Sequence, residues 1–292
     1  MSASPSEAPL VAPGRGLGLV DVLRQRYLLR LLVRKELRVR YRGSVLGLAW
    51  SYVKPAVQFA VFFFALGEFL QQRDTLPPFA IYLFSGMIAV NLFSECFGNA
   101  TRAVVGNAPL VKKIYLPREL FPVSSIWVGL VHFVPQVVVL LVGCVVVGWR
   151  PGLVELAVAL LGVLVVVTLA LGLGLLFGAL DVLYRDLENI VDLILMVAVW
   201  LSPVLYPWTL VRDSLGEGSV LLWLYLHNPL TVAVELFHRA FWYPVADVPA
   251  DRWQIPDGLV WDGVLALAGS LVLLAVGQLV FRRLEGRFAQ EL

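Results

Sequence analysis

Long apolar runs dominate the chain, and short clusters of polar and charged residues separate them. An α-helix needs about 20 mostly apolar residues to cross ~30 Å of hydrocarbon. The pattern predicts six such spans, at about residues 47–70, 79–99, 120–148, 153–180, 189–207 and 258–281. In the fourth, Ala170, Gly174 and Gly178 recur at four-residue spacing. Such a stripe permits close helix contact, although small residues are also ordinary in membrane helices.

Two shorter apolar segments lie between the fifth and sixth predicted spans, at 220–230 and 231–244. Each is too short to span, which favours two re-entrant or interfacial helices. Asn228 is placed to cap the second helix. Glu235 and Arg239 are four residues apart, so we expect them to pair on one helical face.

The chain before the first predicted span divides into two parts. Residues 1–20 are rich in Pro, Ser and Gly, which predicts a disordered tail. From residue 20 to 33 the charges favour one face, and Leu28, Leu29, Leu32 and Val33 favour another. This pattern predicts an amphipathic helix with its leucines in the lipid interface, or else a plain extension of the first span.

Composition places the chain among integral membrane proteins of the all-α class. It is 59% hydrophobic and only 15% charged, whereas soluble proteins carry about 25% charged residues. Most of the 23 Lys and Arg residues fall on one side of the predicted spans, which predicts that both termini are cytoplasmic. The net charge is only +2, so we expect no nucleic-acid partner.

Five basic residues crowd the approach to the first span. They are Arg34, Lys35, Arg38, Arg40 and Arg42. Three roles remain open for them: fixing the orientation of the chain, contacting acidic lipid, or binding phosphate at the cytoplasmic entrance.

Motifs for independent catalysis are absent from the sequence. There is no phosphate-binding loop and no metalloprotease or hydrolase motif. The acids in the predicted spans are few, with Glu68 and Glu95 near the ends and Asp192 early in span five. This scarcity argues against an ion-coupled transporter and an intramembrane enzyme. We expect no cofactor in this chain and a separate motor subunit.

Four blocks of the sequence resemble the permeases of type-2 ABC exporters, in the branch that handles surface polysaccharides. In chain order they are VRKELRVRYRGSVLGLAWSYVKP (33–55), VVGNAPLVKKIYLPRELFPVSS (104–125), DVLYRDLENIVDLILMVAVWLSPVLYP (181–207) and HNPLTVAVELFHRAFW (227–242). The resemblance covers residues 21–292 as one permease domain. It implies six spans, an interface helix and two re-entrant helices in the bacterial inner membrane.

The resemblance also implies partners. A permease homodimer would bind two ATP-binding cassette subunits, and those subunits would carry ATP and Mg. Ten residues are expected to couple the two kinds of subunit: Asn107, Pro109, Lys112, Lys113, Ile114, Tyr115, Pro117, Tyr184, Arg185 and Asp186. The alternatives are a loop made basic only by the orientation rule, and a surface Arg–Asp pair.

The implied substrate is a polysaccharide joined through diphosphate to a polyprenyl lipid: O-antigen, teichoic acid or a cell-wall galactan. The five basic residues would then hold the diphosphate. The aromatic residues expected along the channel are Tyr41, Trp50, Tyr52 and Phe59. At the exit we expect a set of residues from the re-entrant region, which could equally form an interfacial aromatic belt: Tyr206, Trp208, Asn228, Pro229, Glu235 and Arg239.

Three other functions stay open at this point. One is a type-2 ABC permease for small lipids or drugs. Another is a membrane enzyme of lipid-linked glycan synthesis, which needs a catalytic acid or metal in a cavity. The third is a membrane scaffold that works without an ATPase.

Overall fold

The protein is a bundle of membrane-length helices. The structure is a computed structural model that describes residues 18–114, 116–246 and 255–292, and every secondary-structure element in these ranges is helical. The long helices are α3 (Trp50–Phe62), α5 (Phe79–Gly106), α7 (Leu120–Val146), α8 (Leu153–Asp181) and α13 (Leu259–Leu284). Five helical stretches in the described residues are long and apolar enough to cross a membrane, which confirms the integral membrane class.

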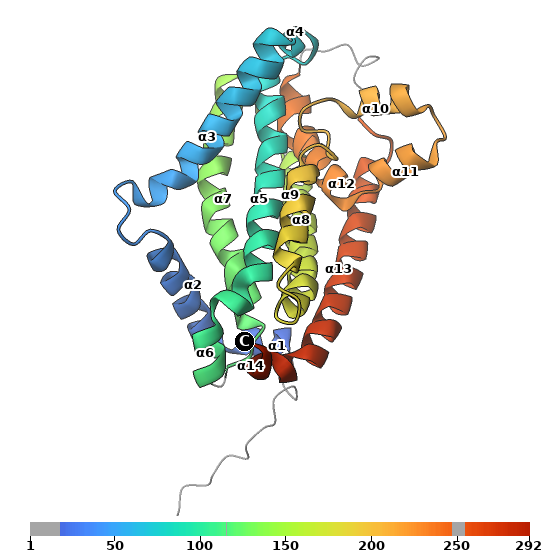
Figure 1. Ribbon diagram of the computed structural model, residues 1–292. Coiled ribbons are helices and arrows are strands. Elements are labelled where there is room, and N and C mark those ends of the chain that lie inside the picture. Colours follow the sequence, from blue (N-terminus) through green and yellow to red (C-terminus); the bar gives the residue numbers. More distant parts are fainter. Residues whose placement is uncertain (1–17, 115, 247–254) are drawn as a thin grey trace, which may run out of the picture.

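The two ends of the bundle differ in charge and in their short helices (Figure 1). One end carries the C-terminus, α6 (Ala108–Lys113) and α14 (Phe288–Glu291), together with the basic residues that end α6 and α13. We call it the basic end. The opposite, or far, end carries α4 (Gln72–Thr75) and α10 (Trp208–Leu215).

Helices α5, α8 and α13 form the tightly packed centre of the bundle. In α5, 72% of the most apolar stretch is buried inside the protein. A Cβ on Gly178 would lie 3.0 Å from the Thr101 carbonyl oxygen of α5, and one on Gly174 would lie 2.5 Å from Ala100 Cβ of α5. Outside the stripe, a Cβ on Gly172 would lie 2.8 Å from the Leu274 nitrogen of α13. The predicted small-residue stripe of α8 is therefore a contact surface, as its spacing indicates.

The first span stands apart from this centre. Helix α3 contains no buried residue, and it crosses the bundle obliquely in Figure 1. It continues into a π-helical segment, Phe63–Phe69, so that the span covers Trp50–Phe69.

The fifth predicted span differs from the prediction. Helix α9 covers only Leu187–Ala198, and turns follow from residue 199 to 206. Twelve residues reach about 18 Å, which is too short to cross the hydrocarbon. Ser202, Pro203 and Pro207 lie in or directly after this non-helical stretch, where proline removes the backbone donors that a helix needs.

Two short helices lie where the re-entrant pair is predicted. Helix α11 (Val220–Leu226) meets helix α12 (Pro229–Phe237) at a bend of 59°, a shape that fits a re-entrant loop and equally a broken sixth span. Asn228 caps α12 by accepting a hydrogen bond from the Leu230 nitrogen at 3.1 Å, as predicted. A π-helical segment, His238–Trp242, continues α12.

The N-terminal helix is divided, and the three leucines predicted to face lipid pack on the protein instead. Helix α1 (Leu19–Arg24) and helix α2 (Arg26–Arg40) meet at Gln25. Leu28, Leu29 and Leu32 pack on a core cluster of the bundle, so their predicted lipid-facing role is wrong. The predicted tail falls mostly on residues 1–17, outside the described ranges.

Candidate functional site

Polar side chains follow one face of α5, the most buried span. Asn91, Ser94, Glu95, Asn99 and Arg102 recur at spacings of three or four, so they share one side of the helix. All five are partly exposed, although most of α5 is buried. Polar groups within a membrane span are costly unless they face a partner or a watery cavity. This face therefore indicates a functional surface.

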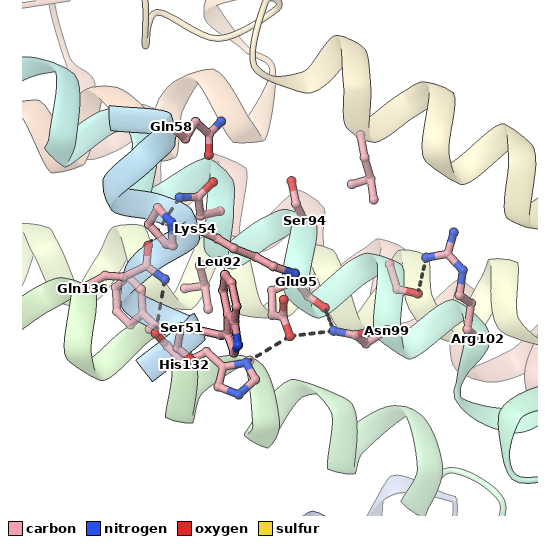
Figure 2. Close-up of a pocket in the computed structure, with 17 residues that line it drawn as sticks. Ser51, Lys54, Gln58, Leu92, Ser94, Glu95, Asn99, Arg102, His132 and Gln136 are labelled. Carbon is pink, nitrogen blue, oxygen red and sulfur yellow. Dashed lines mark hydrogen bonds and ion pairs between the residues drawn. The ribbon is translucent and has the colours of Figure 1, made fainter. Parts of the chain in front are cut away.

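The polar face of α5 lines a cavity of about 370 Å³, shown in Figure 2. Lys54 and Gln58 face it from α3, and His132 and Gln136 face it from α7. Leu195 of α9 closes another side. A polar chamber thus lies between four helices.

A second cavity, of about 620 Å³, adjoins the first toward α2. Arg40, Tyr41 and Ser44 line it. The two cavities share five lining residues: Trp50, Ser51, Lys54, Glu95 and His132. Together they form one polar cleft, a name we keep below, and Arg40 stands at its mouth.

Glu95 is the centre of a hydrogen-bond network at the mouth of the polar cleft. Arg40 forms an ion pair with its Oε1 atom. Asn99 Nδ2 donates to the same oxygen at 2.8 Å, and His132 Nδ1 lies 3.1 Å from it. One carboxylate therefore ties the end of α2 to both α5 and α7 (Figure 2 draws the His132 and Asn99 contacts).

His132 belongs to a chain of hydrogen bonds that reaches α3. Its Nε2 atom lies 2.9 Å from the Tyr41 hydroxyl, which lies 2.7 Å from Ser51 Oγ. Arg40 Nη1 also lies 3.1 Å from His132 Nδ1. The imidazole therefore links α2, α3, α5 and α7 through both of its nitrogens.

Arg102 joins α9 to the other end of the polar face. Its guanidinium donates to Asp192 at 2.5 Å and to Glu188 at 3.4 Å. Asp192 is therefore a partner in an ion pair between helices, consistent with its place near the start of α9.

The structure divides the five predicted entrance residues into two groups. Lys35 Nζ donates to Asn107 Oδ1 at 2.5 Å, and Arg40 pairs with Glu95. Arg34, Arg38 and Arg42 are exposed and form no ion pair within the described ranges. Lys35 and Arg40 therefore hold α2 on the bundle, and the other three are free to meet a ligand.

Glu36 adds a further tie between α2 and α7. Ser124 Oγ donates to its carboxylate at 3.4 Å. Burial raises the pKa of Glu36, while the positive charge of Lys35 opposes this shift. The inward face of α2 thus combines apolar and polar anchors.

The predicted channel aromatics do not form one surface. Tyr41 and Trp50 line the polar cleft. Tyr52 and Phe59 line a separate apolar cavity, and Phe59 packs edge-on to Phe84 at 5.3 Å between ring centroids.

The predicted coupling residues gather at the basic end. Asn107 joins α5 to α6, and Pro109 lies in the first turn of α6. Lys112, Lys113 and Ile114 are exposed, as are Tyr184, Arg185 and Asp186 in the turn between α8 and α9. Pro117 is partly buried before α7, and Tyr115 lies outside the described residues.

None of the predicted exit residues is fully exposed: Trp208 and Glu235 are buried, and the other four are partly buried. Trp208 is only 9% exposed, with the Arg212 guanidinium 5.2 Å from its ring centroid. Tyr206 donates to the Trp200 carbonyl, and Pro229 begins α12. These contacts brace the far end of the bundle.

The expected Glu235–Arg239 pair is not formed. Glu235 is 3% exposed, and its carboxylate lies 3.6 Å from His238 Nδ1. His238 also stacks on Tyr82 at 4.1 Å between centroids. A π-helical segment begins at His238, and its wider turn moves Arg239 around the helix axis. His238, three residues after Glu235, therefore faces the carboxylate in its place.

Sequence reasoning missed most of the polar cleft. Hydropathy and motifs point to none of Asn91, Ser94, Asn99, His132 and Gln136, and they identify Glu95 only as an acid near the end of a span. The signal was the recurrence of polar residues at spacings of three and four from 91 to 102, inside an otherwise apolar span.

Comparison with known proteins gives a consistent match. The profile of the family described as "ABC-2 type transporter" matches residues 27–242. Two proteins of Klebsiella pneumoniae named O-antigen export system permease protein RfbA are each 26% identical over 263 residues, covering 90% of this chain and 94% of the relative. A Myxococcus xanthus protein of the same name is 29% identical over 274 residues, covering 93% and 98%.

Proposed function

Because the chain belongs to the ABC-2 type transporter family, we propose that it is the membrane-spanning permease of an exporter for lipid-linked polysaccharide. The chain matches relatives named as O-antigen export permeases, and the match covers nearly their whole length. The protein is therefore a transport subunit of the inner membrane that works with an ATP-binding partner. The observation that carries the proposal is the polar face of α5 lining a cleft within an apolar bundle.

The polar cleft suits a glycan. Sugar hydroxyls need hydrogen-bond donors and acceptors, and the cleft offers amide and hydroxyl groups from Asn91, Ser94, Asn99, Gln58 and Gln136. Amides can both donate and accept, so they can exchange partners as a polymer moves past.

The charged head of the substrate has a matching surface. Arg34, Arg38 and Arg42 are exposed on α2 and the loop after it, the segment that also carries Arg40 of the polar cleft. Guanidinium groups bind phosphate oxygens in pairs. We assign to them the first capture, at the entrance, of the diphosphate that joins the glycan to its polyprenyl carrier, with the basic end on the cytoplasmic side.

The remaining parts complete an exporter. Two copies of the chain would form the permease, and two ATP-binding subunits would contact α6 and the turn at Tyr184–Asp186. ATP and Mg would be held by those subunits.

The experiment uses cells in which the chain is depleted and then restored. Ser94 lines the polar cleft and makes no hydrogen bond to the described residues, so replacing it breaks no internal hydrogen bond. Leucine at this position removes a cleft-facing hydroxyl and adds apolar bulk to the cleft. Surface polysaccharide should disappear on depletion and return with the natural chain. Ser94→Leu should restore export about tenfold less well, equivalent to ~1.4 kcal/mol.

Ser94→Thr is the matched control, because it keeps the hydroxyl and should restore export. Both variants must reach the membrane in equal amounts. Unchanged surface polysaccharide after depletion would contradict the proposed function.

A further inference from the structure

A third cavity continues the polar cleft toward the far end, and its lining is apolar. Its volume is about 240 Å³, and it lies between α3, α5 and α7. Phe59, Phe84 and Leu140 form part of its wall. Pro55 and Gln136 line both this cavity and the 370 Å³ polar cavity, so the two are neighbours.

The cavity exists because small residues face one another where α3 leaves the bundle. Ala56, Ala80 and Gly143 line it from α3, α5 and α7. Protein interiors are close-packed, and voids larger than a water molecule are few. An apolar opening of this size between membrane helices is suited to a hydrocarbon chain.

Gln136 marks the boundary between polar and apolar surroundings. Its Nε2 atom donates to the His132 carbonyl at 3.2 Å, and its Oε1 atom accepts from Asn91 at 3.4 Å. These contacts hold its polar atoms with the polar residues. The lining beyond Gln136 is almost entirely apolar.

The three cavities therefore form a gradient along α3. Arg40 lies at the charged mouth, Lys54 and the Asn91 and Gln136 amides lie in the middle, and Phe59 lies in the apolar part. Lys54 directly precedes Pro55, which lines the apolar cavity, so a positive charge adjoins the apolar part.

Resting on the proposed function, we propose that the apolar cavity binds the head-proximal isoprene units of the polyprenyl carrier. The carrier's diphosphate, which is bonded directly to the first isoprene unit, then lies beside Lys54 at the boundary between the apolar cavity and the polar cleft. A polyprenyl diphosphate has one chain, which suits a cavity enclosed by three helices, whereas a membrane phospholipid brings two. The glycan follows the polar face of α5 while the tail stays beside α3.

The test uses the permease bound to its ATP-binding subunits in lipid nanodiscs. The probe is a polyprenyl diphosphate that carries a photoreactive diazirine near its head. Illumination should label peptides of α3, α5 and α7 around the cavity. Ala56→Trp fills the cavity and should lower this labelling about tenfold or more, because chain methylenes lose their buried site.

Val57→Trp is the matched control, since Val57 adjoins Ala56 on α3 but is 59% exposed and does not line the cavity. Its labelling should equal that of the natural chain, and both variants must retain their ATP-binding partner. Excess unlabelled polyprenyl diphosphate should compete with the probe, and excess phosphatidylglycerol should not.

Two results would overturn the proposal: equal competition by phosphatidylglycerol, which would make the cavity a phospholipid site, or labelling that Ala56→Trp leaves unchanged. Export by the natural chain is measured separately in cells. Normal export with labelling outside the cavity would refute this site alone, whereas loss of dependence on the chain would refute the proposed function.

Discussion

At the scale of single residues, Glu95 explains why the arginines near the first span are not equivalent. Its carboxylate accepts from Arg40 and Asn99 and contacts His132. Arg40 is thereby committed to holding α2 in place. Arg38 lies two residues earlier on the opposite side of α2 and is exposed. The same residue type thus has a structural role at one position and a free charge at the other.

This difference predicts opposite outcomes for two identical substitutions. Arg40→Gln should destabilise the purified protein by about 2 kcal/mol, because it removes a charge-assisted hydrogen bond. Arg38→Gln should leave the melting temperature unchanged and lower export severalfold. Thermal unfolding in detergent and surface polysaccharide in cells measure the two effects. Equal destabilisation by both variants would remove the distinction between Arg38 and Arg40.

At the scale of elements, α6 is a short helix that presents an exposed edge at the basic end. Val111 is buried and anchors α6 to the bundle. Ile114, the first residue after α6, is 50% exposed. An exposed apolar residue beside two lysines resembles the anchor of a protein interface, where a few residues carry most of the binding energy.

Ile114→Asp should therefore weaken binding of the ATP-binding subunit by about 2 kcal/mol, or roughly 30-fold. Co-purification from mild detergent, quantified against the permease, measures this loss. Ile114→Val is the control and should retain the partner. If Ile114→Asp co-purifies normally, Ile114 is not an anchor.

The elements also show what the sequence could and could not predict. Hydropathy found α5, α7, α8 and α13, since long apolar runs leave few alternatives in a membrane. It misplaced the end of α9, because apolar turns at 199–206 look like helix in a hydropathy pattern. It assigned the leucines of α2 to lipid, because hydropathy cannot distinguish a lipid environment from a protein one. The Glu95 network was hidden because Arg40, Glu95 and His132 lie far apart in sequence.

At the scale of the whole molecule, charge orients the bundle. Basic residues end α6 and α13 at one end. The positive-inside rule assigns this end to the cytoplasm. The two natural cysteines, Cys96 and Cys144, are both fully buried, so introduced cysteines can report topology against a silent background.

Thr75→Cys, in α4 at the far end, should react with a membrane-impermeant maleimide in intact spheroplasts. Lys113→Cys, at the basic end, should react only after lysis. The natural chain, with its buried thiols, is the blank for both. The reverse labelling pattern would invert the molecule in the membrane and move the entrance to the opposite side.

The glycines of α8 separate a rigid part of the bundle from a more mobile part. Their close backbone contacts hold α8 against α5 and α13, so we expect these three helices to behave as one rigid unit. Helix α3 has no buried residue, and α9 is short and contacts α5 through Arg102. We therefore expect these two helices to move relative to the central three. The polar cleft lies between α5 of this rigid unit and the more mobile α3 and α9. We expect that a conformational change in the ATP-binding subunit can widen the polar cleft by displacing α3 and α9. The packed centre of the bundle would not need to rearrange.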